Sequence, residues 1–498
     1  MRTSADLCRF FGAMAILAFL LMTTTSATTY QAGSNLQAAI NAAAAGDTIL
    51  VAPGVYDRVE ITKSISLVGT NAKIRAGERD IGIKIQASDV KVSGFTVEGG
   101  FYGIHLVSSR NCTIFNNTVT GSVQWGIGLV FSDENRIENN VANYNGLGGE
   151  GWYGIYLSNS NRNLIQNNVA SNNGEYGICL FPSCSENVIR GNVAESNDYG
   201  IYTFTDCDEN LVQNNRLSRN KISGIKMIHG CSQNQILENE ISENKVVGIF
   251  LQRDSGYNLI RGNEIADNPV FGIQIQEGPD GNNTILDNNV SGSQKGIFVN
   301  TDGNHVYKNR IFDCVIPAED RGVNQWYAAY PEGGNFWGDH IGSDEMSGPG
   351  QNISGSDGFA DLPYIINERA RDVYPIMGEA VLPLKLVDAS IRPARAQIGT
   401  QVTVESVIDS KYGVAQISAR TKSLQRSSEQ SRYIRMESSS GDDVYVGTLQ
   451  TALMEEGRYK IVLTAKDAKG YEIEEEIGEL ELLPRSGWDF NEVLSQQR

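Results

Sequence analysis

The sequence predicts an all-β protein, with a parallel β-solenoid followed by a small β-sandwich. The unit Asn-x-(Ile/Val)-x-x-Asn recurs about every 24 residues between Ile114 and Val306, and a Gly-Ile pair recurs in phase with it from Gly103 to Gly296. From Leu382 onward, alternating apolar segments separated by polar turns replace the repeat. Helical repeats need longer apolar runs with a period of 3.6 residues, so coils of short strands fit this period better.

The first 27 residues have the layout of a cleaved secretory signal. Arg2 and Arg9 precede an apolar run from Phe10 to Met22, and small residues follow as far as Ala27. This run is short for a membrane span, and no second long apolar run follows it. We therefore expect an exported mature chain without a transmembrane segment, located outside the cell, on its surface or in a periplasm-like space.

Residues 28–80 are predicted to form an N-terminal cap and the first coils. The segment beginning at Asn35 is alanine-rich and amphipathic, which is typical of a short helix. A helix at this place would plug the open end of the solenoid and protect its first edge strand. Pro53-Gly54 separates the strands that follow.

The asparagines of residues 81–315 are interpreted as structural. Equivalent residues of successive coils stack at a strand spacing of about 4.8 Å, so each recurring residue forms a row. Asparagine suits a row at a coil corner because it tolerates left-handed backbone angles and its amide can hydrogen-bond to the amides above and below. One repeat is longer, and its surplus residues, Gly146 to Trp152, are expected to bulge out as a loop.

Two motifs that flank the repeat resemble a known family. "GDTILVAPGVYDRVEITKSISLVG" before it, and "GGNFWGDHIGSDEMSGPGQNISGSDGFADLPYII" with "DVYPIM" after it, are similar to the NosD family of the pectate-lyase-like superfamily. The resemblance covers residues 30–377 and implies a right-handed parallel β-helix of about ten coils, closed by residues 316–380. That fold is shared with carbohydrate-binding proteins and sugar hydrolases, and some family members are linked to copper delivery.

The C-terminal part resembles a different kind of module. Residues 381–485 end in "YKIVLTAKDAKGYE", which is similar to the last strands of extracellular immunoglobulin-like domains. This resemblance implies an immunoglobulin-like β-sandwich, and residues 486–498 then form a tail. Such a module is more often a spacer or adhesion unit than a catalytic one.

Aromatic residues give the strongest prediction of a binding site. In Gly-Ile-x-Leu the Ile and Leu should face inward, which leaves x outward. Tyr156, Tyr202, Phe250 and Phe298 hold that position at every second coil, roughly 9.6 Å apart, and this spacing suits a polysaccharide or cell-envelope glycan. The alternative is that a loop or the C-terminal domain covers these rings. A second row shares the parity of the buried Ile and is interpreted as core stacking; it contains Tyr102, Trp125, Tyr153, Tyr176, Tyr199 and Phe271.

Paired carboxylates are the catalytic candidates. Glu186 and Glu209 fall in one column with Glu134 and Arg162, so the first two could lie about 5 Å apart, as in a retaining glycosidase. The alternative is a charge row on a solvated turn. No tight cluster of aspartates with a basic residue accompanies the pair, so the sequence favours a protein that is not an enzyme.

Candidate ligands for two metals occur in the sequence, and no cofactor is predicted with certainty from them alone. Asp344, Asp357 and Asp361 lie in a glycine-rich segment that resembles the Asp/Gly-rich loop of NosD-like proteins, and they offer the hard oxygen ligands that calcium requires. A plain surface turn is the alternative. Copper needs soft or imidazole ligands, and His340 in "WGDH" is the best candidate among four scattered histidines. Copper binding is not expected from these residues.

The cysteines at 184, 207 and 231 form one row of the repeat. The outer two would be roughly 9.6 Å apart, too far for a single metal ion that holds each sulfur at about 2.3 Å. We interpret Cys184, Cys207 and Cys231 as a row of small side chains. A disulfide between neighbouring coils stays sterically open.

The net charge of −18 excludes the basic footprint of a nucleic-acid-binding protein. The sequence therefore favours a secreted or cell-surface protein with a non-catalytic role in glycan binding or cell-envelope architecture. Its rivals are a NosD-like copper-handling protein and a polysaccharide lyase or hydrolase.

Overall fold

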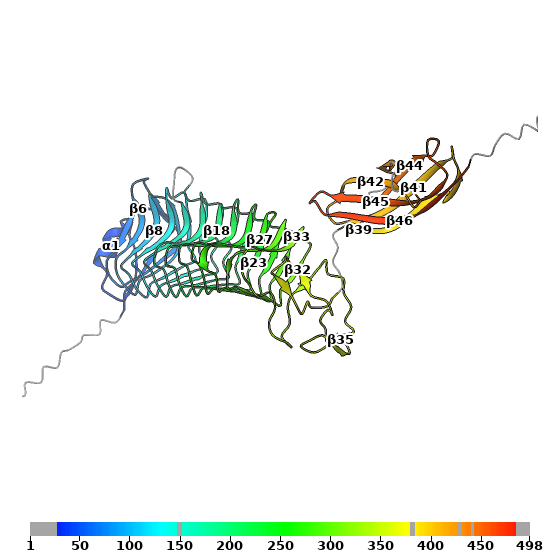
Figure 1. The fold of residues 1–498 in the computed structure, drawn as a ribbon. Helices are drawn as coiled ribbons and strands as arrows, with labels where there is room; N and C mark the ends of the chain where they lie inside the picture. Colours follow the sequence, from blue (N-terminus) through cyan, green and yellow to red (C-terminus); the bar gives the residue numbers. More distant parts are fainter. Residues whose placement is uncertain (1–26, 147–151, 379–383, 426–430, 440–442, 485–498) are drawn as a thin grey trace, which may run out of the picture.

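The computed structural model describes residues 27–146, 152–378, 384–425, 431–439 and 443–484. The expected signal peptide, most of the expected loop and the C-terminal tail lie outside these ranges. Figure 1 shows the repeat as a stack of coils with α1 at one end, the closing segment around β35 at the other, and a separate C-terminal domain. The predicted parallel β-solenoid is confirmed, with about eleven turns.

Three parallel sheets form the sides of the described coils. One contains β4 (Val59–Ile61), β6 (Ile81–Ile85), β8 (Tyr102–Val107), β11 (Trp125–Val130), β14 (Tyr153–Ser158), β16 (Tyr176–Leu180), β18 (Tyr199–Phe204), β21 (Ser223–Ile228), β24 (Val247–Gln252), β27 (Phe271–Asp280), β30 (Lys295–Asp302) and β33 (Ile316–Asp320). We call this the long sheet.

The other two sheets are made of shorter strands. The larger contains β1 (Thr29–Gln31), β2 (Thr48–Val51), β3 (Gly54–Asp57), β5 (Ser66–Ala76), β7 (Lys91–Gly99), β9 (Thr113–Phe115), β10 (Thr118–Thr120), β12 (Arg136–Glu138), β13 (Val141–Ala142), β15 (Leu164–Gln166), β17 (Val188–Arg190), β19 (Leu211–Gln213), β22 (Gln235–Leu237), β25 (Leu259–Arg261), β28 (Thr284–Leu286) and β31 (His305–Tyr307). The smaller contains β20 (Arg216–Ser218), β23 (Glu240–Ser242), β26 (Glu264–Ala266), β29 (Asn289–Ser291), β32 (Arg310–Phe312) and β34 (Phe336–Trp337).

The helix α1 (Leu36–Ala42) caps the first coil, as predicted from the alanine-rich segment. Leu36 and Ile40 are buried and belong to the core of the solenoid. The Gln37 amide pairs with the backbone of Glu60 in both directions, at 2.8 and 3.1 Å. Because β4 is the edge strand of the long sheet, these bonds satisfy backbone groups that would otherwise be open to another chain.

Three rows of asparagine side chains form hydrogen-bond ladders inside the coil corners, which confirms their structural interpretation. In each ladder the backbone N–H and Nδ2 of one asparagine donate to Oδ1 of the asparagine one coil further on. From Asn140 to Asn168 these distances are 2.9 and 3.1 Å. Nδ2 of Asn140 also donates to the Ile114 carbonyl of the preceding coil at 2.8 Å. The side chains are almost completely buried, so this pairing is required.

The members of the ladders follow the repeat. The first contains Asn135, Asn163, Asn187, Asn210, Asn234, Asn258, Asn283, Asn304 and Asn324. The second contains Asn117, Asn140, Asn168, Asn192, Asn215, Asn239, Asn263, Asn288, Asn309 and Asn335. The third, which the sequence analysis did not identify, contains Asn145, Asn173, Asn197, Asn220, Asn244 and Asn268.

Except at Asn324 and Asn335, the last members of the first two ladders, the residue before each ladder asparagine takes the left-handed conformation, and the asparagine itself does not. At Asn167, which precedes Asn168, φ is 53°. Gly191 and Gly262 occupy the same row with φ of 63° and 65°. The expectation that the ladder asparagines hold left-handed angles was therefore wrong by one residue. Their amides are occupied by the ladder, and the sharp turn falls on the exposed position in front of them.

Two ladders end on a buried aspartate that also binds a tryptophan. The first ends where Asn324 Nδ2 donates to Asp320 at 2.7 Å, and the indole of Trp326 donates to the same carboxylate at 2.7 Å. The second ladder ends in the same way. There the backbone N–H of Asn335 donates to Asp372 at 2.6 Å, and the indole of Trp337 does so at 2.9 Å.

The segment after the last coils is held by short antiparallel pairs. It contains β35 (Met346–Ser347), β36 (Ile353–Ser354), β37 (Tyr364–Ile365) and β38 (Arg371–Asp372). Since Asp372 belongs to β38, this segment brings the last acceptor back to the end of the solenoid.

The C-terminal domain is an eight-stranded β domain with its own core. Its strands are β39 (Leu384–Arg392), β40 (Arg395–Gln397), β41 (Gln401–Ser410), β42 (Val414–Ser423), β43 (Tyr433–Ser438), β44 (Val444–Gln450), β45 (Gly457–Asp467) and β46 (Glu472–Leu483). The expected all-β domain is confirmed, whereas its immunoglobulin-like topology stays a prediction. It meets the solenoid at Asp313, whose carboxylate accepts from the Tyr412 hydroxyl at 2.5 Å. Across the described ranges, no helix has the length and hydropathy of a membrane span.

We predict that Asn168→Ala destabilises the solenoid by at least about 3 kcal/mol, because each buried partner left unpaired costs about 1–3 kcal/mol. The change removes the acceptor of two Asn140 donors and a donor to the Ile137 carbonyl. Asn167→Gly is the matched control. It should leave the midpoint of thermal unfolding almost unchanged, because Gly191 already occupies the same row of the repeat. Equal effects of the two variants would contradict the ladder assignment.

We predict that the Asp372 carboxyl makes the protein less stable as the pH rises from about 4 to about 6. Burial raises its pKa to about 6, against the opposing hydrogen bonds from Asn335, Trp337 and Tyr374. A folded-state pKa above the unfolded value means that the folded protein binds more protons in this window, so unfolding becomes easier as these protons leave.

The measurement is the unfolding free energy of the native chain and of Asp372→Asn at pH 4 and pH 7. The native chain should lose stability relative to the variant at the higher pH. Asp361→Asn is the control with the opposite sign, because hydrogen bonds lower the pKa of Asp361. The prediction is refuted if the unfolding free energy of the native chain, minus that of Asp372→Asn, is the same at both pH values or is larger at pH 7.

Candidate functional site

The outer face of the long sheet carries the aromatic residues that the sequence analysis predicted to bind. Ile155 and Leu157 are fully buried, and Tyr156 between them points to the outer face, as strand alternation requires. Tyr202 and Phe250 lie in the same column and are partly exposed. Tyr156 and Phe298 are more covered, with 8% and 4% of their surface exposed.

A second outward column was wrongly interpreted as core stacking. Tyr102, Trp125, Tyr153, Tyr176 and Tyr199 are partly exposed, and their rings contact the outward rings of the first column. Phe271 continues this column and contacts Phe298 at 5.5 Å between ring centroids.

Glycine explains why simple alternation failed at this column. A Cβ on Gly154 would lie 2.6 Å from Nδ2 of Asn173, so this position faces the inner ladder. The next residue, Ile155, is also fully buried. Two successive positions therefore face inward, and Tyr153 in front of them is turned to the outside. The recurrence of glycine before the buried Ile in every coil was the signal that could have revealed this.

The outward rings form one continuous surface. Tyr102 stacks on Trp125 with centroids 3.9 Å apart, and Tyr176 stacks on both Tyr153 and Tyr199, at 5.0 and 5.3 Å. The rings of Tyr156 and Tyr202 contact the rings of this row, with centroids 4.4 to 5.1 Å apart. We call this surface the aromatic face; its residues are Tyr102, Trp125, Tyr153, Tyr156, Tyr176, Tyr199 and Tyr202.

The aromatic face is made of neutral side chains. Burial raises the pKa of Tyr156 to about 12 and also raises those of Tyr176 and Tyr202. His105, beside Trp125 at 5.4 Å, is lowered to a pKa of about 4 by burial and by the charge of Lys84. At neutral pH the surface therefore offers uncharged rings.

Beyond the aromatic face the same sheet becomes mixed in character. Nζ of Lys226 lies 4.9 Å from the centroid of Phe250 and 5.6 Å from that of Tyr199. Lys295 lies 5.2 Å from the centroid of Phe298 and forms an ion pair with Glu319. Two lysines thus lie over aromatic rings in this part of the sheet.

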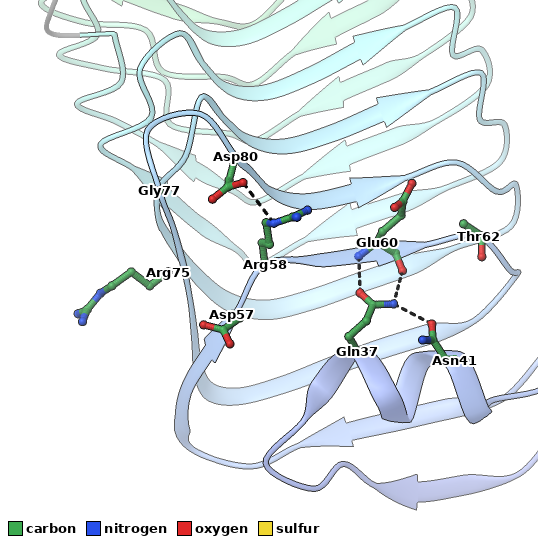
Figure 2. Close-up of a pocket in the computed structure, with 9 residues that line it drawn as sticks. All are labelled: Gln37, Asn41, Asp57, Arg58, Glu60, Thr62, Arg75, Gly77 and Asp80. Atoms are coloured by element: carbon green, nitrogen blue, oxygen red, sulfur yellow. Dashed lines mark hydrogen bonds and ion pairs between the residues drawn. The ribbon is translucent and has the colours of Figure 1, made fainter.

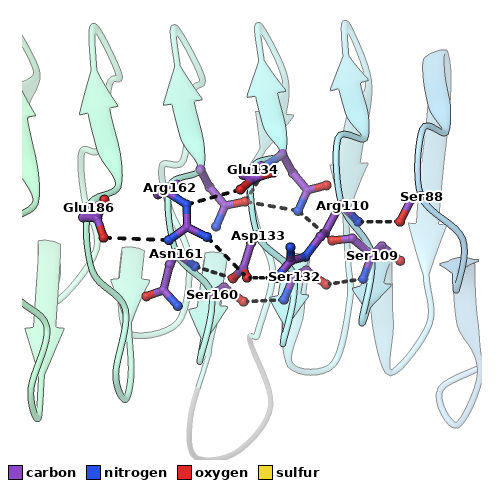
Figure 3. A network of polar contacts seen from close by, with 12 residues as sticks. Ser88, Ser109, Arg110, Ser132, Asp133, Glu134, Ser160, Asn161, Arg162 and Glu186 are labelled. Atoms are coloured by element: carbon purple, nitrogen blue, oxygen red, sulfur yellow. Dashed lines mark hydrogen bonds and ion pairs between the residues drawn. The ribbon is translucent and has the colours of Figure 1, made fainter.

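The carboxylate candidates lie on an exposed turn row, and Figure 3 shows the part of this row that contains Glu186. Arg162 reaches Glu134 at 3.3 Å and Glu186 at 3.8 Å, which is the predicted charge row. Glu186 and Glu209 are exposed and left-handed, with φ of 59° and 56°, because each precedes a ladder asparagine. Their place in the turn is explained by the repeat without catalysis.

The aspartates of the expected calcium loop are occupied by hydrogen bonds from the loop itself. Asp344 accepts from the backbone N–H groups of Asp357 and Gly358, each at 2.9 Å. Asp357 accepts from the backbone of Gly348 at 3.0 Å, and Asp361 from that of Met346 at 2.9 Å. The three carboxylates thus brace the turn. Within the described ranges, no three His, Cys, Asp or Glu side chains are grouped to hold a metal ion. Calcium binding therefore stays a prediction.

The six cysteines of the described chain are free and buried. Cys207 Sγ contacts the carbonyls of Leu180 and Thr205 at 3.6 Å, and Cys184 Sγ that of Pro182 at 3.4 Å. The side chains of Cys184, Cys207 and Cys231 belong to the solenoid core, whereas Cys179 lies in the outward column with Tyr156 and Tyr202. This agrees with the interpretation of the row as small packed side chains.

An open cavity of about 730 Å³ lies between α1 and the first coils (Figure 2). Its lining is polar, and its charged groups are largely paired already. Arg58 forms an ion pair with Asp80 at 3.2 Å, and Glu60 forms one with Lys84 at 3.0 Å. The bonds between Gln37 and Glu60 close one side of it. We regard this cavity as part of the cap.

The fold and this surface define a class, namely a parallel β-helix protein that presents an aromatic strand face. Residues 40–223 and 203–342 match the family described as "Periplasmic copper-binding protein (NosD)". The chain belongs to this family.

Other relatives share shorter or more distant likeness. A stretch of 77 residues is 34% identical to a cell surface glycoprotein of Methanothermus fervidus; it covers 15% of this chain and 13% of that protein. The mannuronan C-5 epimerase AlgE6 A-module of Azotobacter vinelandii is 20% identical, with 58% of this chain and 93% of that chain covered and a TM-score of 0.40. The family 28 exopolygalacturonase of Yersinia enterocolitica is 11% identical, with coverages of 58% and 74% and a TM-score of 0.42.

The residues do not fit the copper that the family description names. Copper requires several soft or imidazole donors at one point. His340 packs edge-on against Tyr364 at 5.6 Å, and its Nε2 has no hydrogen-bond partner. His105 lies in β8 of the long sheet. His229 bonds to Arg253, and both of these residues belong to coils distant from His340. The described histidines therefore do not converge on one centre, and we assign no copper step.

We predict that Gly128→Val disturbs the aromatic face without unfolding the solenoid. A Cβ at Gly128 would lie 2.6 Å from Cε3 of Trp125, so the indole must leave its stack on Tyr102. The near-ultraviolet circular dichroism of the aromatic side chains should weaken while the far-ultraviolet signal is kept. Gly33→Val is the control, since a Cβ there meets nothing within 4 Å. Unchanged near-ultraviolet spectra of both variants would exclude this packing.

Proposed function

We propose that the protein is an exported, non-catalytic glycan-binding β-helix and that the aromatic face binds the sugar chain. The observation that carries the proposal is the unbroken series of partly exposed rings from Tyr102 to Tyr202 across five adjacent strands. Aromatic side chains with an apolar ring and a polar tip are favoured where a ligand has both apolar and polar faces, as sugars do.

The arrangement supports binding by a preformed surface. Each ring is held by its neighbours, and the strands beneath are fixed by the ladders. Tyrosine and tryptophan lose little conformational entropy when they bind, because few torsions remain free. The rings follow the strand spacing of about 4.8 Å along the solenoid axis, which favours an extended chain over a compact ligand.

Export is supported by three observations of different kinds. The N-terminal residues have the order of a secretory signal. The family is described as periplasmic, and the partly matching relative is a cell surface glycoprotein. A polysaccharide or cell-envelope glycan is the partner that such a location would supply. We do not propose hydrolysis or elimination, because Glu186 and Glu209 lie on turns away from the aromatic face.

The test is retention of the full chain by a panel of neutral and acidic polysaccharides, with the length of the polysaccharide followed in parallel. We expect at least one glycan to retain the protein without being shortened. Trp125→Ala combined with Tyr176→Ala should weaken retention about tenfold or more, since each lost stacking contact costs about 0.5–1.5 kcal/mol.

Tyr433→Ala is the matched control, because Tyr433 is 76% exposed and lies in the C-terminal domain. Retention should be unchanged in this variant. The proposal fails if no glycan retains the protein or if the double variant binds as well as the native chain. Shortened product chains would instead indicate an enzyme.

A further inference from the structure

Lys226 occupies a special place at the end of the aromatic face. In the register of the long sheet it lies between Tyr202 and Phe250, its partners on the two neighbouring strands. Its ammonium group lies over two rings, those of Tyr199 and Phe250. The side chain is partly exposed, so its charge borders the surface on which we place the glycan.

Lys226 differs from the other lysines of this outer face in its charge balance. Lys84 is paired with Glu60 at 3.0 Å, and Lys295 is paired with Glu319. Lys226 forms no ion pair with a carboxylate in the parts of the chain that the structure describes. Partial burial and the charge of Arg253 lower its pKa, and only Glu277 acts in the opposite direction.

An unpaired, partly desolvated cation is unfavourable for the free protein. It is also unexpected in a chain of net charge −18, where carboxylates are abundant. Contact with the two rings recovers part of the lost hydration through cation–π attraction. A negatively charged ligand group beside the same rings would supply the missing counter-charge.

We propose that Lys226 selects glycans that carry an anionic substituent, a carboxylate or a sulfate, next to the sugar stacked on Tyr199, Tyr202 or Phe250. This inference rests on the proposed function of the aromatic face and adds the chemical class of its ligand. The neutral rings bind the sugar faces, and Lys226 contributes a charge-assisted hydrogen bond to the acidic group.

The test compares pairs of polysaccharides that differ in charge alone. Polygalacturonate is compared with its methyl ester, and dextran sulfate with dextran, at 0.15 M salt as a roughly physiological ionic strength. The native chain should bind one or both charged members about tenfold more tightly than the neutral member, which is the size of one hydrogen bond to a charged group. The two pairs distinguish a carboxylate from a sulfate ligand.

The variants are Lys226→Met, Lys226→Arg and Lys295→Met. Lys226→Met should abolish the charge preference and keep the weaker binding of the neutral member, whereas Lys226→Arg should restore the preference. Lys295→Met is the matched control. It also removes a lysine that lies over an aromatic ring of the long sheet, but the charge of Lys295 is already balanced by Glu319. Thermal unfolding of each variant verifies that the solenoid is intact.

The outcomes separate this inference from the proposed function. If the native chain binds charged and neutral members equally, or if Lys226→Met keeps the preference, the role of Lys226 is refuted while glycan binding stands. If the native chain binds none of the four polysaccharides and none of the wider panel, the proposed function fails, and the inference fails with it.

Discussion

The asparagine ladder is the interaction on which the rest of this structure depends. Each side-chain amide accepts two hydrogen bonds from the preceding coil and donates one to the following coil, as Asn168 does with Asn140 and Asn192. Because the amides are buried, a coil shifted by one residue would leave several of them unpaired. The ladders therefore fix the register of every coil, and this register places outward side chains in straight columns.

The columns explain why a functional surface can arise from a repeat whose interior hardly varies. Most inward positions hold Ile, Val, Leu, small residues or ladder amides, with Phe95 and Met227 among the exceptions. The outward positions are free to differ from coil to coil, and they read Tyr156, Cys179, Tyr202, Lys226 and Phe250 along one column. The character of the outer surface is therefore determined by residues of different strands in one column, and not by successive residues of one strand.

Much of the fold could be predicted from the sequence, because a repeat shows the same choice many times. The period, the cap helix and two asparagine rows were visible in this way. The third row recurs in the same way, eight residues after the apolar position, at Asn145 and its equivalents. Features that occur once were harder, because Asp320 and Asp372 acquire their role only when the chain returns to the end of a ladder.

The candidate site was predicted less well than the fold. Tyr156, Tyr202, Phe250 and Phe298 were placed on the correct side by strand alternation, but the row of Tyr153 was placed on the wrong one. Alternation assumes a regular pleat, and the glycine before each buried Ile interrupts it by turning two successive positions inward. Likewise the asparagine rows indicated sharp corners, but only the backbone angles show that the turn falls one residue earlier.

The direction of the ladders has an electrostatic consequence. Every side-chain carbonyl points toward the N-terminal end, and every linking N–H points toward the C-terminal end. The amide dipoles of each row are therefore aligned and add along the solenoid axis, as peptide dipoles do in an α-helix. The positive pole lies at the C-terminal end, where the buried carboxylates Asp320 and Asp372 stand. The molecule is therefore an axial dipole with two carboxyl groups at its positive pole, and this dipole grows with the number of coils in the ladders.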